Sequence, residues 1–134
     1  MSLEKFSVSM CVYGGDHPQW FQTAVESILH QTVKPDEVVL VVDGPVPETL
    51  DAVIRSFEAD PIFRVIRLPQ NMGHGEARRT GLRACSHDLV ALMDADDISA
   101  PDRFEKQLRL FREQPELTIA GGNGCIGNKR KVIT

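Results

Sequence analysis

The chain has 134 residues, a net charge of −4 at pH 7 and 42% hydrophobic residues, values typical of one soluble globular domain. Its acidic balance argues against nucleic-acid binding, which needs a clustered basic surface, and the short basic run at 129–131 resembles a solvated tail. No apolar stretch approaches the ~20 residues of a membrane span. The cysteines Cys11, Cys85 and Cys125 lack zinc-ligand or disulfide spacing, so buried thiols and a reducing compartment are expected.

Strand-like segments recur along the chain. Alternating or continuous apolar runs predict strands over residues 6–12, 37–42, 63–68, 89–93 and 117–120. The glycine-rich stretch from Gly121 onward predicts no element.

Helix-like segments lie between the strands. The first follows Asp16-His17-Pro18, carries Trp20, Phe21, Ala24 and Ile28 as an apolar stripe, and ends at Pro35. The second helix carries Leu50, Val53, Ile54 and Phe57 at helical spacing. The third covers residues 76–84, and the fourth runs from Pro101 to Pro115. Small residues in the third (Ala77, Gly81, Ala84) would let it lie close to a sheet.

This alternation predicts an α/β fold, a doubly wound and largely parallel sheet with flanking helices, because parallel strands need right-handed helical crossovers. One domain is expected over residues 1–134.

Polar residues follow three of the predicted strands, at the edge where open parallel sheets bind ligands. They are Tyr13 and two glycines after the first strand, Asp43-Gly44 after the second, and Asp94-Ala95-Asp96-Asp97 after the fourth. The strand interiors are apolar, so this edge is the candidate site.

The acidic run after the fourth strand places three carboxylates within four residues. Such charges repel unless a positive group lies among them, and Mg²⁺ or Mn²⁺ takes one or two carboxylates together with phosphate oxygens. The alternative is an acidic turn that caps the next helix. Its position after an apolar strand, with other polar groups nearby, favours a metal site at Asp94 and Asp96.

Two further positions have competing interpretations. Asp43 is either ordinary turn chemistry or an acceptor that reads a ribose or base, and its position on this edge favours the second. Arg78 and Arg79 open the third helix, where they suit a pyrophosphate or are simply solvated. His17 and His74 lie in loops and receive no role.

Together these segments resemble the family 2 glycosyltransferases, which have the GT-A nucleotide-sugar-binding fold. The likeness runs in order from about residue 6 to residue 113 and is carried by residues 7–13, 24–32, 37–44, 71–73, 77–81 and 92–97. A lone Asp-x-Asp is weak evidence, whereas six segments in order and spacing are strong.

The resemblance implies a donor-binding role for residues at matching positions. Val12, Tyr13 and Asp43 would line the nucleoside pocket, usually for uridine, and Arg78 would lie near the base or phosphates of the donor.

The acidic run would receive the rest of the donor. Asp94 would face the ribose side of the nucleotide sugar, and Asp96 would ligate the Mn²⁺ or Mg²⁺ that bridges the pyrophosphate. The metal would neutralise the departing nucleoside diphosphate.

Two departures from the family pattern concern the nucleotide. Gly14-Gly15-Asp16 replaces the usual asparagine after the first tyrosine, and the second strand ends in one acid, Asp43, where many relatives have two. The family's catalytic base belongs to the acceptor-binding half, which we expect beyond Thr134, so the fragment alone would be inactive.

The resemblance thus implies a metal-dependent, inverting sugar transfer from a UDP-linked donor to a saccharide or lipid-linked acceptor, as in polysaccharide biosynthesis. The implied location is cytoplasmic, including the cytoplasmic face of a membrane.

Three other functions compete with this interpretation. A phosphatase of the haloacid dehalogenase type would use Asp94 as nucleophile and Asp96 as acid/base, but that motif normally ends the first strand and needs a later lysine. A nicotinamide-dependent oxidoreductase would need its glycine fingerprint directly after the first strand. A non-catalytic sugar-nucleotide-binding module would share the same site.

Overall fold

The computed structural model describes residues 5–113, 119–120 and 131–133, which form an α/β fold around one parallel sheet. Its six strands, in the order β3-β2-β1-β4-β6-β5, are β1 (Ser7–Val12), β2 (Glu37–Val42), β3 (Phe63–Arg67), β4 (Leu89–Asp94), β5 (Ile119–Ala120) and β6 (Lys131–Ile133). Every neighbouring pair is parallel, so the carboxyl ends of the strands share one edge. The predicted fold class is confirmed.

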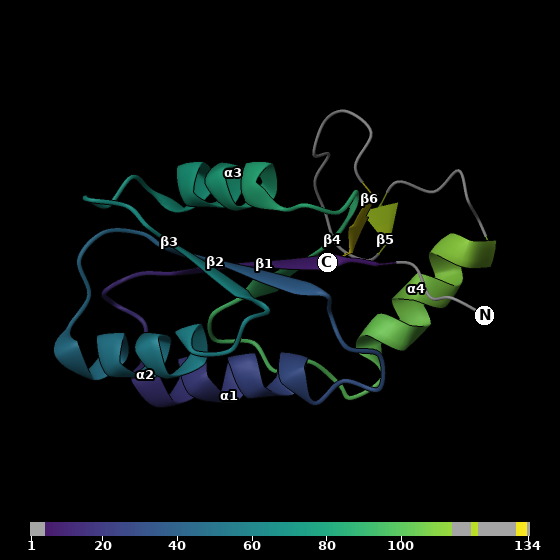
Figure 1. Ribbon diagram of the computed structural model, residues 1–134, viewed down its shortest axis with the longest axis horizontal. Coiled ribbons are helices and arrows are strands. Elements are labelled where there is room, and N and C mark those ends of the chain that lie inside the picture. The colour runs from purple at the N-terminus through teal and green to yellow at the C-terminus, as the bar shows by residue number, and fades with distance from the viewer. Residues whose placement is uncertain (1–4, 114–118, 121–130, 134) are drawn as a thin grey trace.

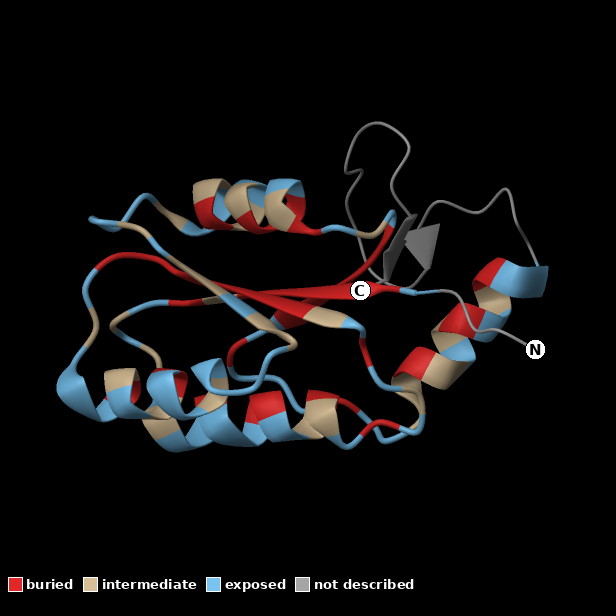
Figure 2. Cartoon of the chain, in the orientation of Figure 1, coloured by how far each residue is buried: buried red, intermediate tan, exposed pale blue. Residues whose placement is uncertain are grey.

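Helices cover both faces of the sheet (Figure 1). On one face lie α1 (Pro18–Leu29), α2 (Glu48–Glu58) and α4 (Arg103–Glu113), and on the other lies α3 (His74–Ala84). The larger apolar core lies on the three-helix side around Phe6, Phe21 and Phe104, whereas α3 covers a smaller one. Figure 2 shows the buried strands between helices whose outer faces are exposed.

The small-residue face of α3 lets that helix approach the sheet closely. A Cβ added to Gly81 would lie 2.5 Å from Ser9 Oγ and 3.3 Å from Val41 Cγ2, so a larger residue would push α3 outward. Ala77 is buried at the same interface, as predicted.

Several predicted boundaries need correction. α3 begins at His74 rather than Glu76, and α4 begins at Arg103 after a turn at Pro101. Trp20 does not join the buried stripe of α1: it is 63% exposed and stacks on His17 with ring centroids 4.8 Å apart. β6 was not predicted, because a three-residue strand carries too little periodicity.

Other expectations fall on residues that lie outside the described ranges. They concern the helix end at Pro115, the first part of the strand at 117–120, the thiol of Cys125 and most of the basic run at 129–131. Within the described ranges, no helix is long and apolar enough to cross a membrane.

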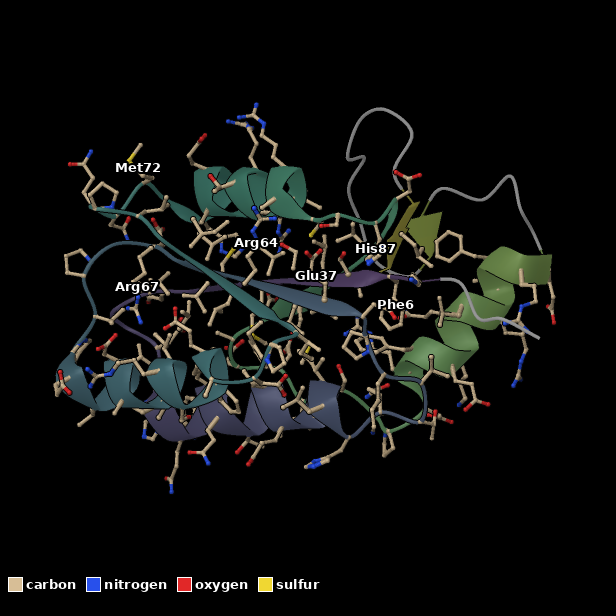
Figure 3. The ribbon with its side chains drawn as sticks, in the orientation of Figure 1. Phe6, Glu37, Arg64, Arg67, Met72 and His87 are labelled. Atoms are coloured by element: carbon tan, nitrogen blue, oxygen red, sulfur yellow. The ribbon has the colours of Figure 1, made fainter. Side chains whose placement is uncertain are left out.

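At the edge where the strands begin, the side chain of Glu37 in β2 links β2 to β1 and to the turn before β4. Its carboxylate accepts hydrogen bonds from Ser7 Oγ at 2.7 Å, Ser86 N at 2.8 Å and Ser86 Oγ at 2.9 Å. Figure 3 shows Glu37 near His87, well away from Met72 at the opposite edge. Burial acts to raise the pKa of Glu37, but these hydrogen bonds and His87 outweigh it and the pKa is lowered.

We expect Glu37→Gln to lower the free energy of unfolding by about 1 kcal/mol at pH 7, the value of a typical lost hydrogen bond. Because the folded-state pKa of Glu37 lies below its unfolded value, its contribution is present above about pH 4.5 and is lost as pH falls through the lowered pKa. Urea unfolding of both proteins at pH 7 and pH 3 measures this. A difference that stays constant with pH would contradict it.

Candidate functional site

A cavity of about 490 Å³ opens at the edge of the sheet where the strands end. The ends of β1, β2 and β4 form it together with the start of α3. Of the predicted site residues, five line it: Val12, Tyr13, Asp43, Asp94 and Asp96. The sixth, Arg78, lies beside it and reaches Asp94.

Sequence reasoning missed four polar or flexible positions in the cavity wall: Asp16, Asn71, Gly73 and His74. Asp16 was noted at the helix start and as part of a departure from the family pattern but was not named as a site residue, and His74 was given no role. A signal existed for the last three, because 71–75 is a glycine-rich loop between two elements on the ligand-binding edge.

Asp43 holds the loop between β3 and α3 against the cavity. It is 5% exposed, and its Oδ1 and Oδ2 accept hydrogen bonds from Met72 N at 2.7 Å and Gly73 N at 3.2 Å. The Asp43 backbone carbonyl accepts from Asn71 Nδ2 at 3.2 Å. Asp43 therefore shapes the cavity wall, and a ligand would use whatever acceptor capacity these bonds leave.

The adjacent Gly44 is required by both conformation and space. Its φ is +89°, which side-chain-bearing residues rarely adopt, and an added Cβ would lie 2.5 Å from Asn71 N and 2.9 Å from Asn71 Cα. The Asp43-Gly44 pair thus fixes how closely the loop approaches the end of β2.

A hydrogen bond to the Asp16 carboxylate stabilises the turn after β1. Asp16 Oδ2 accepts a hydrogen bond from Tyr13 N at 3.0 Å, and Tyr13 is half-exposed. The Tyr13 ring lies directly over Gly15, where an added Cβ would come within 2.7 Å of the ring. Gly15, one of the residues that replace the family's usual asparagine, thus leaves room for the tyrosine ring beside the cavity.

The carboxylates of the turn after β4, residues 94–97 (the acidic turn), differ in their contacts. The turn is closed by a backbone hydrogen bond from Asp97 N to Asp94 O at 3.3 Å. Asp94 Oδ1 lies 3.4 Å from Arg78 Nη2, whereas the exposed Asp96 carboxylate forms no hydrogen bond or ion pair within the described residues. Asp96 is therefore the carboxylate most available to an incoming cation.

Negative charge dominates the cavity. The pKa of Asp16 is raised, first by burial and then by the charges of Asp96 and Asp94, against the hydrogen bond from Tyr13 and the influence of His74. Burial and the same two carboxylates raise the pKa of Asp97. A bare nucleoside diphosphate would meet net repulsion here, so this field favours one that arrives with a cation.

Cys11 lies in the cavity wall and is only half-buried, which corrects the expectation of a buried structural thiol. Burial raises its pKa to about 11, with Arg78 opposing and Asp43 and Asp94 adding to the shift. The thiol is therefore protonated near neutral pH in the unliganded protein. Cys85 is buried, as expected.

The carboxylates of the cavity fit a hard divalent cation that takes its remaining ligands from water and from the phosphates of a bound nucleotide. No group of three or more His, Cys, Asp or Glu side chains within the described ranges could enclose a metal. Mg²⁺ and Mn²⁺ do not need such a cage, because they bind through one or two carboxylates with phosphate oxygens and water. Asp94 and Asp96 on the cavity wall match that pattern.

A second cavity of about 480 Å³ lies on the other side of Asp94 and includes Arg78 and Arg103. Lysine lines neither of these two cavities in the part of the chain that the structure describes.

Comparisons with known proteins point to one family. The model of the family described as "Glycosyl transferase family 2" matches residues 7–133. An uncharacterized glycosyltransferase of Haemophilus influenzae is 45% identical over 118 residues, which are 88% of this chain and 44% of that protein. The amylovoran biosynthesis glycosyltransferase AmsE of Erwinia amylovora is 40% identical over 87% of this chain and 44% of its own length.

One relative carries a more specific name. The UDP-Gal:alpha-D-GlcNAc-diphosphoundecaprenol beta-1,3-galactosyltransferase of Escherichia coli is 44% identical over 86% of this chain and 42% of its own. The chain thus spans less than half the length of these curated relatives.

Among solved structures, residues 1–349 of S. aureus TarS in complex with UDP match with a TM-score of 0.71 at 20% identity. The match covers 92% of this chain and 38% of that one, and it shows a shared fold.

Proposed function

The chain belongs to glycosyl transferase family 2, and we propose that it binds the nucleotide-sugar donor of a glycosyltransferase that uses a UDP-linked sugar with Mn²⁺ or Mg²⁺. The observation that carries this proposal is the meeting of two predicted groups in one cavity. Val12, Tyr13 and Asp43 lie at the ends of β1 and β2, and Asp94 and Asp96 lie at the end of β4.

Each group has a distinct task in donor binding. Tyr13 offers an aromatic face at the cavity mouth, and Asp43 holds the loop that closes the opposite wall. Asp94 and Asp96 provide oxygen ligands, and Arg78 provides a cation within reach of Asp94 for the diphosphate. A bound Mn²⁺ or Mg²⁺ would supply charge stabilisation to the leaving nucleoside diphosphate.

Two relatives support the nature of the substrates. The name of the Escherichia coli relative specifies a UDP-linked donor and a lipid diphosphate-linked saccharide acceptor, and the TarS structure contains UDP. We propose the same classes for the protein that carries this chain, with a role in polysaccharide biosynthesis and inversion at the anomeric carbon, as the family resemblance implies. The coupling constant of the anomeric proton in the product would distinguish inversion from retention.

Calorimetric titration of UDP with and without Mn²⁺ tests the proposal. We expect binding that is at least about tenfold tighter with Mn²⁺, because the diphosphate otherwise enters an acidic cavity. ADP and GDP serve as controls for the base. No Mn²⁺-dependent binding of UDP would overturn the proposed donor site.

Binding alone would not separate a transferase from the non-catalytic module that shares this site. A transfer assay on the full protein that carries this chain, with UDP-sugars and a lipid diphosphate-linked saccharide, makes that distinction, because only the enzyme releases UDP when acceptor is added. If the full protein binds UDP with Mn²⁺ but releases no UDP from UDP-sugars when acceptor is added, the non-catalytic module is favoured.

A further inference from the structure

Gln31, just after α1, is a polar side chain with 1% exposure, so its amide must find partners inside the protein. Its Nε2 donates to Ser27 O at 3.0 Å and to Ala100 O at 2.6 Å, and its Oε1 accepts from Phe104 N at 3.1 Å. Both distant partners lie beyond the acidic turn: Ala100 is in the segment that leads into α4, and Phe104 is in the first turn of α4.

Two more bonds join the end of α1 to this segment, residues 98–102, which we call the latch loop. Ser27 Oγ accepts from Ser99 N at 3.0 Å, and Thr32 N donates to Pro101 O at 2.8 Å. The latch loop therefore has backbone bonds to α1 and the residues after it at three successive positions, Ser99, Ala100 and Pro101.

The other side of the latch loop is fastened to the strand that precedes the acidic turn. Arg103 Nη2 donates to Leu92 O at 2.9 Å, and its Nη1 donates to Ser99 Oγ at 2.9 Å. Both ends of the acidic turn are thus held, one by β4 and the other by the latch loop.

These hydrogen bonds oppose a repulsion, because the acidic turn carries several carboxylates of like charge. Asp94, Asp96 and Asp97 repel one another, because three carboxylates lie within four residues. Without a cation the turn would tend to open. Bonds to a buried amide oppose opening without adding charge.

We propose that Gln31 and Ser27 are positioning residues that keep the acidic turn in the geometry that binds the metal and diphosphate, acting through the latch loop. This inference rests on the proposed function and assigns a task to the 24–32 segment, which the donor site itself does not use. A side-chain amide suits the position, since Ala100 O needs a donor and Phe104 N needs an acceptor.

The sharpest variant is Gln31→Glu, which keeps the size and the acceptor but removes the donors to Ser27 O and Ala100 O. With Mn²⁺ present, we expect UDP affinity to fall about tenfold, whereas uridine without metal binds within about twofold of wild type. Ser27→Ala introduces the strongest helix former into α1 and loses the bond from Ser99 N, so a fall in UDP affinity of about threefold is expected.

The matched control is Glu37→Gln, which weakens a comparable polar tie at the opposite edge of the sheet. It should lower stability and leave both UDP and uridine binding unchanged. Hydrogen exchange of the unliganded proteins adds a direct measurement, because amides of the acidic turn and latch loop should exchange faster in Gln31→Glu and Ser27→Ala only.

The outcomes separate cleanly. Selective loss of Mn²⁺-dependent UDP binding supports the inference; equal loss of UDP and uridine, or no loss and no faster exchange, overturns it. If Gln31→Glu does not fold, Ser27→Ala decides by the same criteria. A wild type without Mn²⁺-dependent UDP binding overturns the proposed function and this inference with it, whereas a wild type that binds alongside unchanged variants overturns this inference alone.

Discussion

We expect Asp96→Ala to weaken Mn²⁺-dependent UDP binding by at least about a hundredfold while the chain stays folded, and to abolish sugar transfer in the full protein that carries this chain. Asp96 is exposed and forms no hydrogen bond or ion pair within the described residues, so its removal breaks no contact there. It also relieves repulsion within the acidic turn, so the free energy of unfolding should be unchanged or slightly higher.

The matched control is Asp102→Asn, also an acid that follows β4. Asp102 lies outside both described cavities; its side chain pairs with Lys106 at 3.2 Å on the surface and takes no part in the latch-loop bonds at Ser99, Ala100 and Pro101. UDP affinity should stay within about twofold, since such an exposed pair contributes little. Calorimetry on wild type and both variants, with and without Mn²⁺, decides. UDP binding that ignores both the metal and Asp96→Ala would leave the nucleoside pocket in place and remove the metal assignment.

The sequence was most informative where periodicity was strong. The Glu-Val-Val-Leu-Val-Val run predicted β2 with its observed bounds, because a continuous β-branched stretch has few alternatives to a strand buried on both faces. The small residues of α3 predicted its close approach to the sheet. β6 could not be predicted this way, because three residues are too short for a pattern. The exposure of Trp20 could not be predicted either, because it depends on whether another segment covers the first turn of α1.

The site was predictable as an edge of the sheet but not as a cavity. Parallel strands bring their carboxyl ends together, so Val12, Asp43 and Asp94 could be placed on one edge from their positions in the sequence. The pairing of Arg78 with Asp94 could not be predicted, because it depends on how α3 turns above the sheet.

The hydrogen bonds of the latch loop could not be predicted from the sequence either. They join residues such as Gln31 and Ala100 that lie far apart in the chain, and no local pattern reports such a contact.

Three glycines around the site differ in what they require, and this gives the second large prediction. Gly44 has a positive φ and no room for a side chain, Gly73 has a positive φ of +96° with nothing within 4 Å of an added Cβ, and Gly75 has neither constraint. We expect Gly44→Ala to lower the free energy of unfolding by about 4 kcal/mol, from backbone strain together with overlap against Asn71. Strain alone predicts a loss of about 2 kcal/mol for Gly73→Ala.

Gly75→Ala is the control, and it should raise the free energy of unfolding by about 0.5 kcal/mol, since alanine restricts the unfolded chain and Gly75 lies within α3. Function should follow the same order. Gly44→Ala pushes against Asn71, in the loop that Asp43 holds at the cavity, so UDP affinity should fall about tenfold, whereas Gly75→Ala should leave it unchanged. Urea unfolding and UDP titration of the three variants test both orders. If Gly44→Ala proved no less stable than Gly73→Ala, the close approach to Asn71 would not be what requires glycine after Asp43, and the Asn71–Gly73 loop would be set by the hydrogen bonds to Asp43 alone.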